Sequence, residues 1–274
     1  MRFLYPNGKK QALTFSFDDN QSFDRELISI FNKYNVKGTF NINTSTLDKG
    51  AETNCDGNIY INTAEINSLY KGHEIAAHGH FHKYLPGLTD TMILEEFLSN
   101  RKILENITGK LVQGSAYAYG VSDSHIRELM KSMGFKYARG VTSTGNFFPP
   151  VDFMDWTPTC HQADPNLMNY CETFLNVPGY IDLPLMYVWG HSFEFGRNNN
   201  DYSSIEKFCS KISGKDFIWY ATNIEICNYI LATKNLEFNA ECTMVFNPGV
   251  IKIWIEKDDG KLITVDSGQT VSIL

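Results

Sequence analysis

The sequence predicts an α/β protein built on a parallel sheet or barrel, followed by a small antiparallel unit. Short apolar runs alternate with helix-like segments over most of the chain, the order typical of parallel strands joined by helices. Polar side chains follow two of these strands at their carboxyl ends, where such folds place catalytic groups. From about Leu236, strand-like segments follow one another directly.

Periodicity and turn residues give the expected position of each element. Strands are expected at residues 12–17, 38–43, 74–77, 136–141, 185–190 and 217–221. Ser22 and Thr63 are expected to cap helices, a further helix is expected to start at Ser122, and others to cover 91–107, 204–212 and 224–232. The antiparallel unit should contain strands at 250–256, 262–265 and 270–273, with a hairpin turn at 258–260. Residues 44–62 and 142–180 lack periodicity and are expected to form long loops.

Length and composition favour one large domain at residues 1–235 and an appendage at residues 236–274. A net charge of -7 and a pI near 5.5 argue against a nucleic-acid partner. No apolar run is long enough to cross a membrane, and the first residues lack the apolar core of a signal peptide. A cytoplasmic location is therefore expected, unless a leader has been removed. The six cysteines form no CxxC pair, so a cysteine zinc site is not expected.

Two adjacent carboxylates, Asp18 and Asp19, end the first strand in the stretch ALTFSFDDN. Neighbouring carboxylates repel each other and are costly to bury. They can be explained as a helix cap with a turn. They can also be explained as a metal ligand beside a catalytic base, which requires partners from elsewhere in the chain.

Two histidines at a spacing of four, His78 and His82, follow the third strand in HEIAAHGHFHKYL. This spacing places both imidazoles on one face of a helical turn or of a strand, and His80 would join them only in a strand. Two histidines and one carboxylate, with open positions left, suit a catalytic zinc or another divalent ion. Asp19 can supply the carboxylate.

With these residues, the chain resembles the NodB-homology polysaccharide deacetylases of carbohydrate esterase family 4. TFSFDDN is similar to the first family motif, TFDDG, with Asn20 in place of glycine. HGHFH is similar to the second, H-[ST]-x-x-H, with Gly79 in place of the hydroxyl residue. The resemblance implies Asp18 as the catalytic base, and Asp19, His78 and His82 as metal ligands. It also implies an incomplete (β/α) barrel of about seven strands over roughly residues 10–235.

A third motif, RxPY in the family, is similar to SAYAYG at residues 115–120. The resemblance implies that the Tyr119 backbone N–H stabilises an oxyanion, with the Tyr119 side chain at the substrate. Ala116 stands where the family has an arginine that holds the catalytic aspartate. Arg139, at the end of a later strand, is a candidate replacement or an ordinary surface arginine.

The fourth and fifth motifs are similar to FMDWTPT at 153–159 and YVWGHSFEF at 187–195. The first offers Asp152 or Asp155 for the family's DxxW motif, with Trp156 as a substrate contact. In the second, His191 takes the place of the general acid, and Trp189 that of an apolar residue lining the acetyl pocket. Glu225 could orient His191, or it could be the first-turn carboxylate of a helix.

The resemblance implies a metal-dependent hydrolase that removes acetyl groups from N-acetylated carbohydrates or from a small N-acetylated substrate. Zinc is the expected ion, although the ligand types also suit cobalt, nickel and iron. The departures at Ala116 and Trp189 keep a second hypothesis open, hydrolysis of another C–N bond in a cyclic amide or ureide. A third hypothesis, motivated by Asn20 and Ala116, is a carbohydrate-binding protein without turnover.

Overall fold

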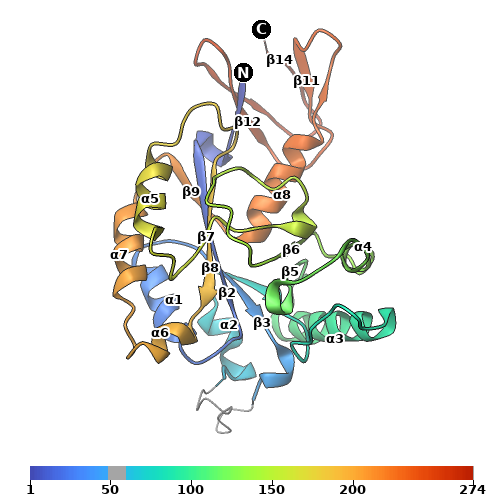
Figure 1. Cartoon of the computed structure of the whole chain (residues 1–274). Coiled ribbons are helices and arrows are strands. Elements are labelled where there is room, and N and C mark those ends of the chain that lie inside the picture. The colour runs from blue at the N-terminus through green and yellow to red at the C-terminus, as the bar shows by residue number, and fades with distance from the viewer. Residues whose placement is uncertain (49–59, 274) are drawn as a thin grey trace.

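The computed structural model describes residues 1–48 and 60–273, and its centre is a parallel half-barrel (Figure 1). Its strands are β2 (Gln11–Asp18), β3 (Thr39–Ile42), β4 (Glu74–Ala77), β5 (Gly114–Ala116), β6 (Tyr137–Arg139), β7 (Cys160–His161), β8 (Leu185–His191) and β9 (Ile218–Tyr220). Seven of them follow one another in the order β6-β5-β4-β3-β2-β8-β7, and β9 joins through β2. The predicted α/β fold with an incomplete barrel is confirmed.

Helices cover the sheet on two flanks (Figure 1). They are α1 (Asp24–Lys33), α2 (Ile66–Leu69), α3 (Asp90–Thr108), α4 (Ser124–Ser132), α5 (Leu167–Leu175), α6 (Phe193–Arg197), α7 (Ser203–Ile212) and α8 (Asn223–Lys234). In the view of Figure 1, α1, α5, α6 and α7 lie on one side of the strands, and α3 and α4 on the other.

The central strand β2 is buried along its whole length, and its two faces carry different side chains. Phe15 packs outward, with its ring centroid 4.5 Å from that of Phe31 on α1. Thr14 and Ser16 face the barrel interior, where Thr14 Oγ1 donates to Asn223 Oδ1 at 2.8 Å and Ser16 Oγ accepts from Asn41 Nδ2 at 2.8 Å. Because buried polar groups need partners, this alternation fixes which side chains reach the interior.

Three local expectations are wrong. The region 142–180, expected to be a long loop, contains β7 and α5. The buried residues of α5 are Leu167, Cys171 and Phe174, which follow a helical spacing among polar neighbours. Thr63 does not cap the helical turn that begins there, because Asn62 is the cap and forms a reciprocal capping box with Glu65. Ser22 does not cap α1, whose N-cap is Phe23. In the other expected loop, residues 49–59 lie outside the described residues.

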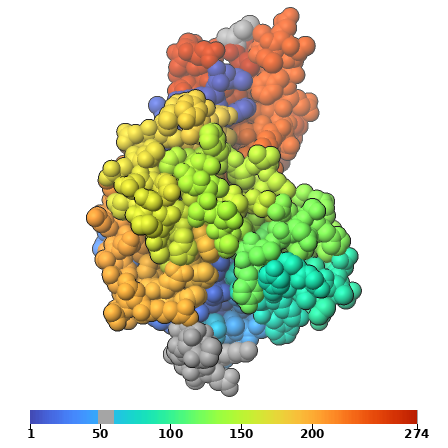
Figure 2. All heavy atoms as spheres, viewed as in Figure 1, coloured from blue at the N-terminus to red at the C-terminus, as the bar shows by residue number. Residues whose placement is uncertain are grey.

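The C-terminal unit forms two small antiparallel sheets at one end of the barrel (Figure 1). Its orange and red atoms gather at the top of the molecule in Figure 2. One sheet consists of β1 (Arg2–Leu4), β12 (Ile253–Glu256) and β13 (Leu262–Val265), and the other of β10 (Glu237–Phe238), β11 (Met244–Phe246) and β14 (Thr270–Ser272). The N-terminal strand thus completes a sheet made otherwise of C-terminal residues. Ile253, Ile255 and Val265 share one buried apolar cluster with Tyr5 and with Tyr229 of α8, so the unit packs against the barrel.

None of the helices in the described ranges is long and apolar enough to span a membrane. The five cysteines that the structure describes are all free thiols, and four of them are buried. Those four thiols are packed in the protein interior. Cys55 lies outside the described residues.

Candidate metal and catalytic site

Strand register brings the candidate residues to one edge of the sheet. Asp18, the last residue of β2, is paired with Asn41 of β3 on one side and with His191 of β8 on the other. His78 directly follows β4, the neighbour of β3. Asp18, His78 and His191 line a cavity of about 330 Å³, together with Asp19, His82, Tyr117, Tyr119, Gly120, Val141 and Trp189.

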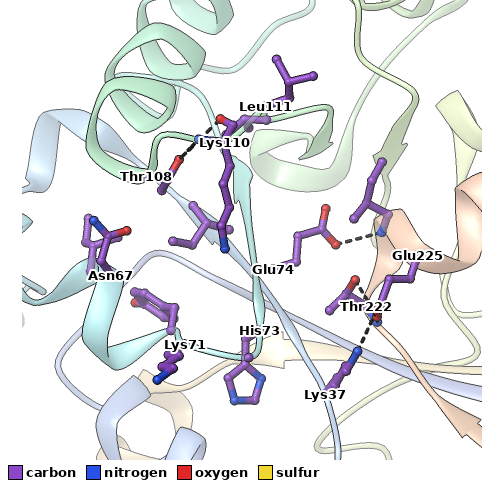
Figure 3. A pocket seen from close by; sticks show the side chains of 16 residues that line it. Lys37, Asn67, Lys71, His73, Glu74, Thr108, Lys110, Leu111, Thr222 and Glu225 are labelled. Atoms are coloured by element: carbon purple, nitrogen blue, oxygen red, sulfur yellow. Dashed lines mark hydrogen bonds and ion pairs between the residues drawn. The ribbon is translucent and has the colours of Figure 1, made fainter.

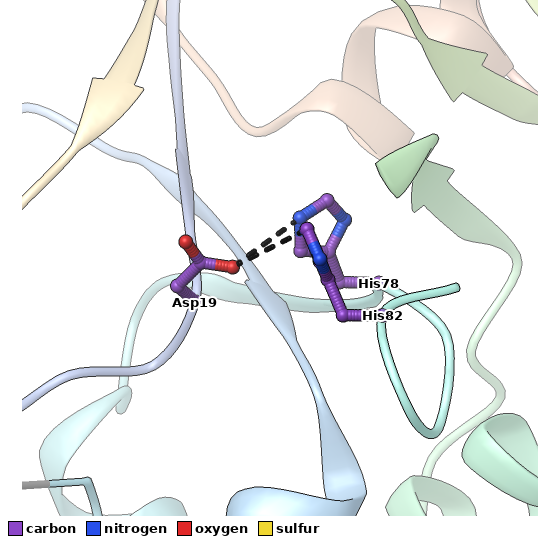
Figure 4. Close-up of side chains that lie close together, drawn as sticks. All are labelled: Asp19, His78 and His82. Carbon is purple, nitrogen blue, oxygen red and sulfur yellow. Dashed lines mark ion pairs between the residues drawn. The ribbon is translucent and has the colours of Figure 1, made fainter. Parts of the chain in front are cut away.

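Asp19, His78 and His82 converge on one point (Figure 4). Asp19 Oδ1 lies 3.5 Å from His78 Nε2 and 3.7 Å from His82 Nε2. Two ligands at about 2.1 Å from a tetrahedral ion would stand about 3.4 Å apart. The spacing of these three atoms therefore fits one small divalent ion.

The tautomer of His78 also suits a metal. Its Nδ1 lies 2.9 Å from the Ala116 carbonyl oxygen, which can only accept, so Nδ1 carries the proton. The lone pair of Nε2 therefore faces Asp19. A backbone carbonyl that fixes a ligating histidine in this way is a common outer-shell contact in metal sites.

The backbone around the ligands is held in the left-handed region, with φ of 77° at Asp19 and 57° at His82. Such residues cost about 1–3 kcal/mol each and persist where the surroundings fix them. Glu96 of α3, which is 2% exposed, fixes the loop: its Oε1 accepts from the backbone N–H groups of Phe81 at 2.7 Å and Lys83 at 3.2 Å. These two donors flank His82 directly.

Asp18 is held by Arg139 deep in the site. Arg139 Nη2 lies 2.5 Å from both carboxylate oxygens of Asp18, and Asn41 Nδ2 donates to Oδ1 at 2.8 Å. Arg139 is fully buried and Asp18 is 3% exposed. Burial alone would raise the pKa of Asp18, but the Arg139 guanidinium holds it well below its usual range. Asp18 is thus ionised, and its Oδ2 lies 4.0 Å from His191 Nε2.

Residues 5–138, just under half of the chain, match the family model described as polysaccharide deacetylase. The resemblance to the polysaccharide deacetylases is confirmed. The matched segment includes Asp18, Asp19, His78 and His82, whereas Arg139, Trp189 and His191 lie beyond it. A comparison with curated proteins gives no match.

Three solved structures illustrate the shared deacetylase fold. One, from Mycobacterium smegmatis and described as a polysaccharide deacetylase, is 19% identical with a TM-score of 0.61, over 85% of this chain and 94% of that one. Another, from Pseudomonas aeruginosa PAO1 and described likewise, is 16% identical with a TM-score of 0.62, over 82% and 92%. A third, a CE4 family pseudoenzyme from Bacillus anthracis, is 14% identical with a TM-score of 0.51, over 83% and 68%. Since one is a pseudoenzyme, the deacetylase fold by itself does not establish catalytic activity. An argument for activity must come from the residues of the site.

The departures from the deacetylase motifs at Ala116 and Trp189 have one structural explanation. Ala116 of β5 is paired in register with Arg139 of β6, so the arginine enters the same region from the adjacent strand. The Arg139 guanidinium carbon lies 4.6 Å from the centroid of the Trp189 ring. Trp189 is 8% exposed, so its large ring supports the relocated arginine as well as lining the cavity.

Asn20, in place of the motif glycine, occupies a turn with φ of 38°. Asparagine tolerates positive φ better than most residues. Its side chain also ties the turn to the loop after β3: Oδ1 accepts from the Asn43 N–H at 2.9 Å, and Nδ2 donates to Thr46 Oγ1 at 3.1 Å. This departure therefore preserves the turn that presents Asp19.

Gly79 has φ of 80°, and a Cβ added there would lie 2.6 Å from Glu96 Oε1. Replacing Gly79 by alanine is therefore expected to lower the free energy of unfolding by about 2–4 kcal/mol, measured by urea denaturation. Gly214 is the matched control, because its φ is 66° but nothing lies within 4 Å of an added Cβ. Gly214→Ala should cost only about 1–2 kcal/mol. Equal losses in the two variants would contradict the role given to Glu96.

His191 is oriented by Glu194, a residue that the sequence analysis missed. Its Nδ1 lies 2.8 Å from Glu194 Oε1, which leaves Nε2 toward Asp18 and Asp19. Burial lowers the pKa of His191, but the Glu194 hydrogen bond and the two aspartates outweigh it and raise the pKa.

The suggestion that Glu225 orients His191 is wrong. Glu225 caps α8 through the Thr222 N–H and pairs with Lys37, which confirms its reading as a helix-terminal carboxylate.

Trp156 does not line the cavity, so the expectation that it contacts the substrate is wrong. It is 1% exposed and packs against Tyr137, Phe153 and Tyr187 in the core. Asp152 and Asp155 also lie elsewhere: Asp155 pairs with Arg127, and Asp152 caps a short 3-10 turn. These two carboxylates are thus accounted for by local structure. His80 contacts Thr44 at 2.7 Å through Nδ1 and takes no part in the metal cluster.

Tyr119 lies at the mouth of the site, 60% exposed, with its ring centroid 4.7 Å from that of His82. Its φ of 61° turns the chain after β5. Tyr119, Asp19 and His82 also line a second hollow of about 460 Å³, together with Gln21, Asn43, Ser45, Thr46, Tyr60, Phe81, Phe193 and Arg197. The site therefore opens into a space large enough for a sugar unit.

A cavity of about 370 Å³ at the opposite end of β3 and β4 is a separate feature (Figure 3). Glu74, at the start of β4, contributes a half-buried carboxylate to it. Oε1 accepts from Tyr137 Oη and Oε2 accepts from Thr39 Oγ1 and the Ile224 N–H, each at 2.9 Å. With its oxygens used in this way, Glu74 joins the end of the barrel to α8. The deacetylase-like residues are all at the other end of the strands.

Proposed function

We propose that this protein is a divalent-metal-dependent hydrolase that removes acetyl groups from N-acetylated sugars. The observation that carries the proposal is the combination of a three-residue metal cluster with an unligated, ionised aspartate beside it. Asp19, His78 and His82 would hold the ion, and Asp18 is engaged by Arg139 and Asn41 instead. When bound, a divalent cation supplies Lewis acidity that lowers the pKa of water and polarises a carbonyl group.

The remaining steps are assigned to residues of this chain. Asp18 accepts a proton from the water molecule as its oxygen adds to the acetyl carbon. Tyr119 lines the cavity, and its backbone N–H is the proposed donor to the oxyanion. The C–N bond then breaks as His191 Nε2 donates a proton to the leaving nitrogen. Acetate and the free amine are the products, and the two side chains exchange their protons with solvent.

Zinc is the proposed ion, since its preferred ligands are histidine nitrogen and carboxylate oxygen at tetrahedral spacing. The proposed substrate is a carbohydrate because the hollow beside the metal cluster presents Phe81, Tyr119 and Phe193, rings on which a sugar can stack.

The proposal is tested by acetate release from N-acetylglucosamine oligomers, with small cyclic amides assayed in parallel. Turnover of the oligomers that is lost with a chelator and restored by Zn²⁺ is the expected result. Turnover of the cyclic amides alone would favour the other C–N substrate. Binding of oligomers without turnover under any divalent ion would reject the enzyme in favour of a carbohydrate-binding protein.

A further inference from the structure

A second group of metal-ligand types lies beside the first: His161, His191 and Glu194. Glu194 Oε1 lies 2.8 Å from His191 Nδ1 and 3.3 Å from His161 Nε2. By spacing alone this group could hold an ion. Its hydrogen bonds, however, argue against a metal site.

The proton on His161 is placed by its own backbone. Nδ1 of His161 accepts from the Ala163 N–H at 3.2 Å, so in the neutral ring the proton sits on Nε2. This Nε2–H points at Glu194, where an ion would need a lone pair. His78 shows the opposite arrangement, with Nδ1 protonated and Nε2 free. The second group is therefore a hydrogen-bond chain, His161–Glu194–His191, and the first is the metal site.

Gln162 completes the chain. Its Nε2 donates to Glu194 Oε2 at 3.1 Å and to the His191 carbonyl at 2.9 Å. The side chain crosses Gly190, where an added Cβ would lie 2.6 Å from its Cδ. Glycine at 190 is therefore required for this contact. Glu194 thus receives donors from β7 and its following turn as well as from His191.

His161 is itself fixed by packing. It is paired in register with Trp189, and the two ring centroids are 4.7 Å apart. The same Trp189 ring supports Arg139. Rigid packing on one side and a fixed proton on the other make His161 suited to orient Glu194.

We propose that His161, through Glu194, is a positioning residue for proton donation by His191. The inference rests on the proposed function. Loss of the His161 donor lets Glu194 and then the His191 ring turn, so that Nε2 no longer points at the leaving nitrogen. The step affected is protonation of the nitrogen as the C–N bond breaks, not binding of the metal or of the substrate.

The test compares two acetyl donors that differ in their need for an acid. An N-acetylglucosamine oligomer requires protonation of its leaving amine, whereas 4-nitrophenyl acetate releases an anion that is stable by itself. In His161→Phe, kcat for the oligomer should fall about 10–100-fold with KM unchanged, as for lost outer-shell partners. The kcat for the ester should change less than about twofold. His161→Gln, which restores an N–H near the position of Nε2, should recover most of the loss.

Nitrogen NMR of the metal-free chain supplies a readout that needs no activity. His161 should show protonated Nε2 and bare Nδ1, and the signal of His191 Nδ1 should shift in His161→Phe. Zn²⁺ titration should give the same stoichiometry in the wild type and in both variants. The proposal would be overturned if kcat fell equally for both acetyl donors, or if Nδ1 of His161 were protonated. It would also be overturned if either His161 variant bound one equivalent of zinc fewer than the wild type. If the wild type hydrolyses neither donor, the proposed function fails. The NMR result still decides whether the hydrogen-bond chain His161–Glu194–His191 exists.

Discussion

Replacing Arg139 by methionine is expected to lower the free energy of unfolding by about 3–5 kcal/mol, measured by urea denaturation at neutral pH. Arg139 and Asp18 are both buried, and Arg139 supplies the contacts that offset the burial of the Asp18 charge. Without it, an ionised carboxylate remains in the interior with Asn41 as its neighbour. Turnover should fall as well, because Asp18 loses its orientation.

Two variants control this experiment. In Arg139→Met with Asp18→Asn, the uncompensated charge is absent, so most of the lost stability should return. Arg127→Met removes an arginine that pairs with Asp155 in a partly exposed position, and should cost at most about 1 kcal/mol. If Arg139→Met and Arg127→Met cost the same, Arg139 is not the partner that Asp18 depends on.

Asp18→Asn is expected to reduce kcat for deacetylation by about 10²–10⁴-fold while leaving metal content unchanged. The amide cannot accept the proton of the attacking water, but it keeps the shape of the side chain. Asp19→Asn is the matched comparison, since it alters a proposed ligand one residue away and should lose the metal together with activity. Acetate release and metal analysis on the same preparations measure both properties.

The reverse pattern of metal content would contradict the roles assigned to Asp18 and Asp19. A metal-free Asp18→Asn protein beside a metal-loaded Asp19→Asn protein would mean that the two carboxylates exchange functions. Full turnover in Asp18→Asn would mean that no base is needed at this position.

The strand ends carrying Asp18, Asp19 and His78 could be predicted because an apolar run followed by polar residues marks where a parallel strand stops. Parallel register then brings those ends together, whatever the intervening sequence. Asn20 and Gly79, both at positive φ, were visible as departures from a motif. Their compensation was not visible, because Asn43 and Glu96 lie on other elements.

The sequence could name Arg139 as a candidate partner of Asp18, but it could not exclude that Arg139 is an ordinary surface arginine. Its selection depends on the register of β5 against β6, which places it beside Ala116. Glu194 was missed because it follows His191 on a short helix rather than at a strand end, so no strand pattern marks it. Trp156 was misassigned because an adjacent Asp–Trp pair is equally compatible with a buried aromatic cluster.

The central claim is that one divalent ion is held by Asp19, His78 and His82. Calorimetric titration of Zn²⁺ into the chelator-treated full chain tests it most directly. We expect one equivalent to bind to the wild type, and none to bind with comparable affinity to His78→Ala or Asp19→Asn. A wild-type chain that binds no zinc, or variants that bind it as the wild type does, would contradict the account.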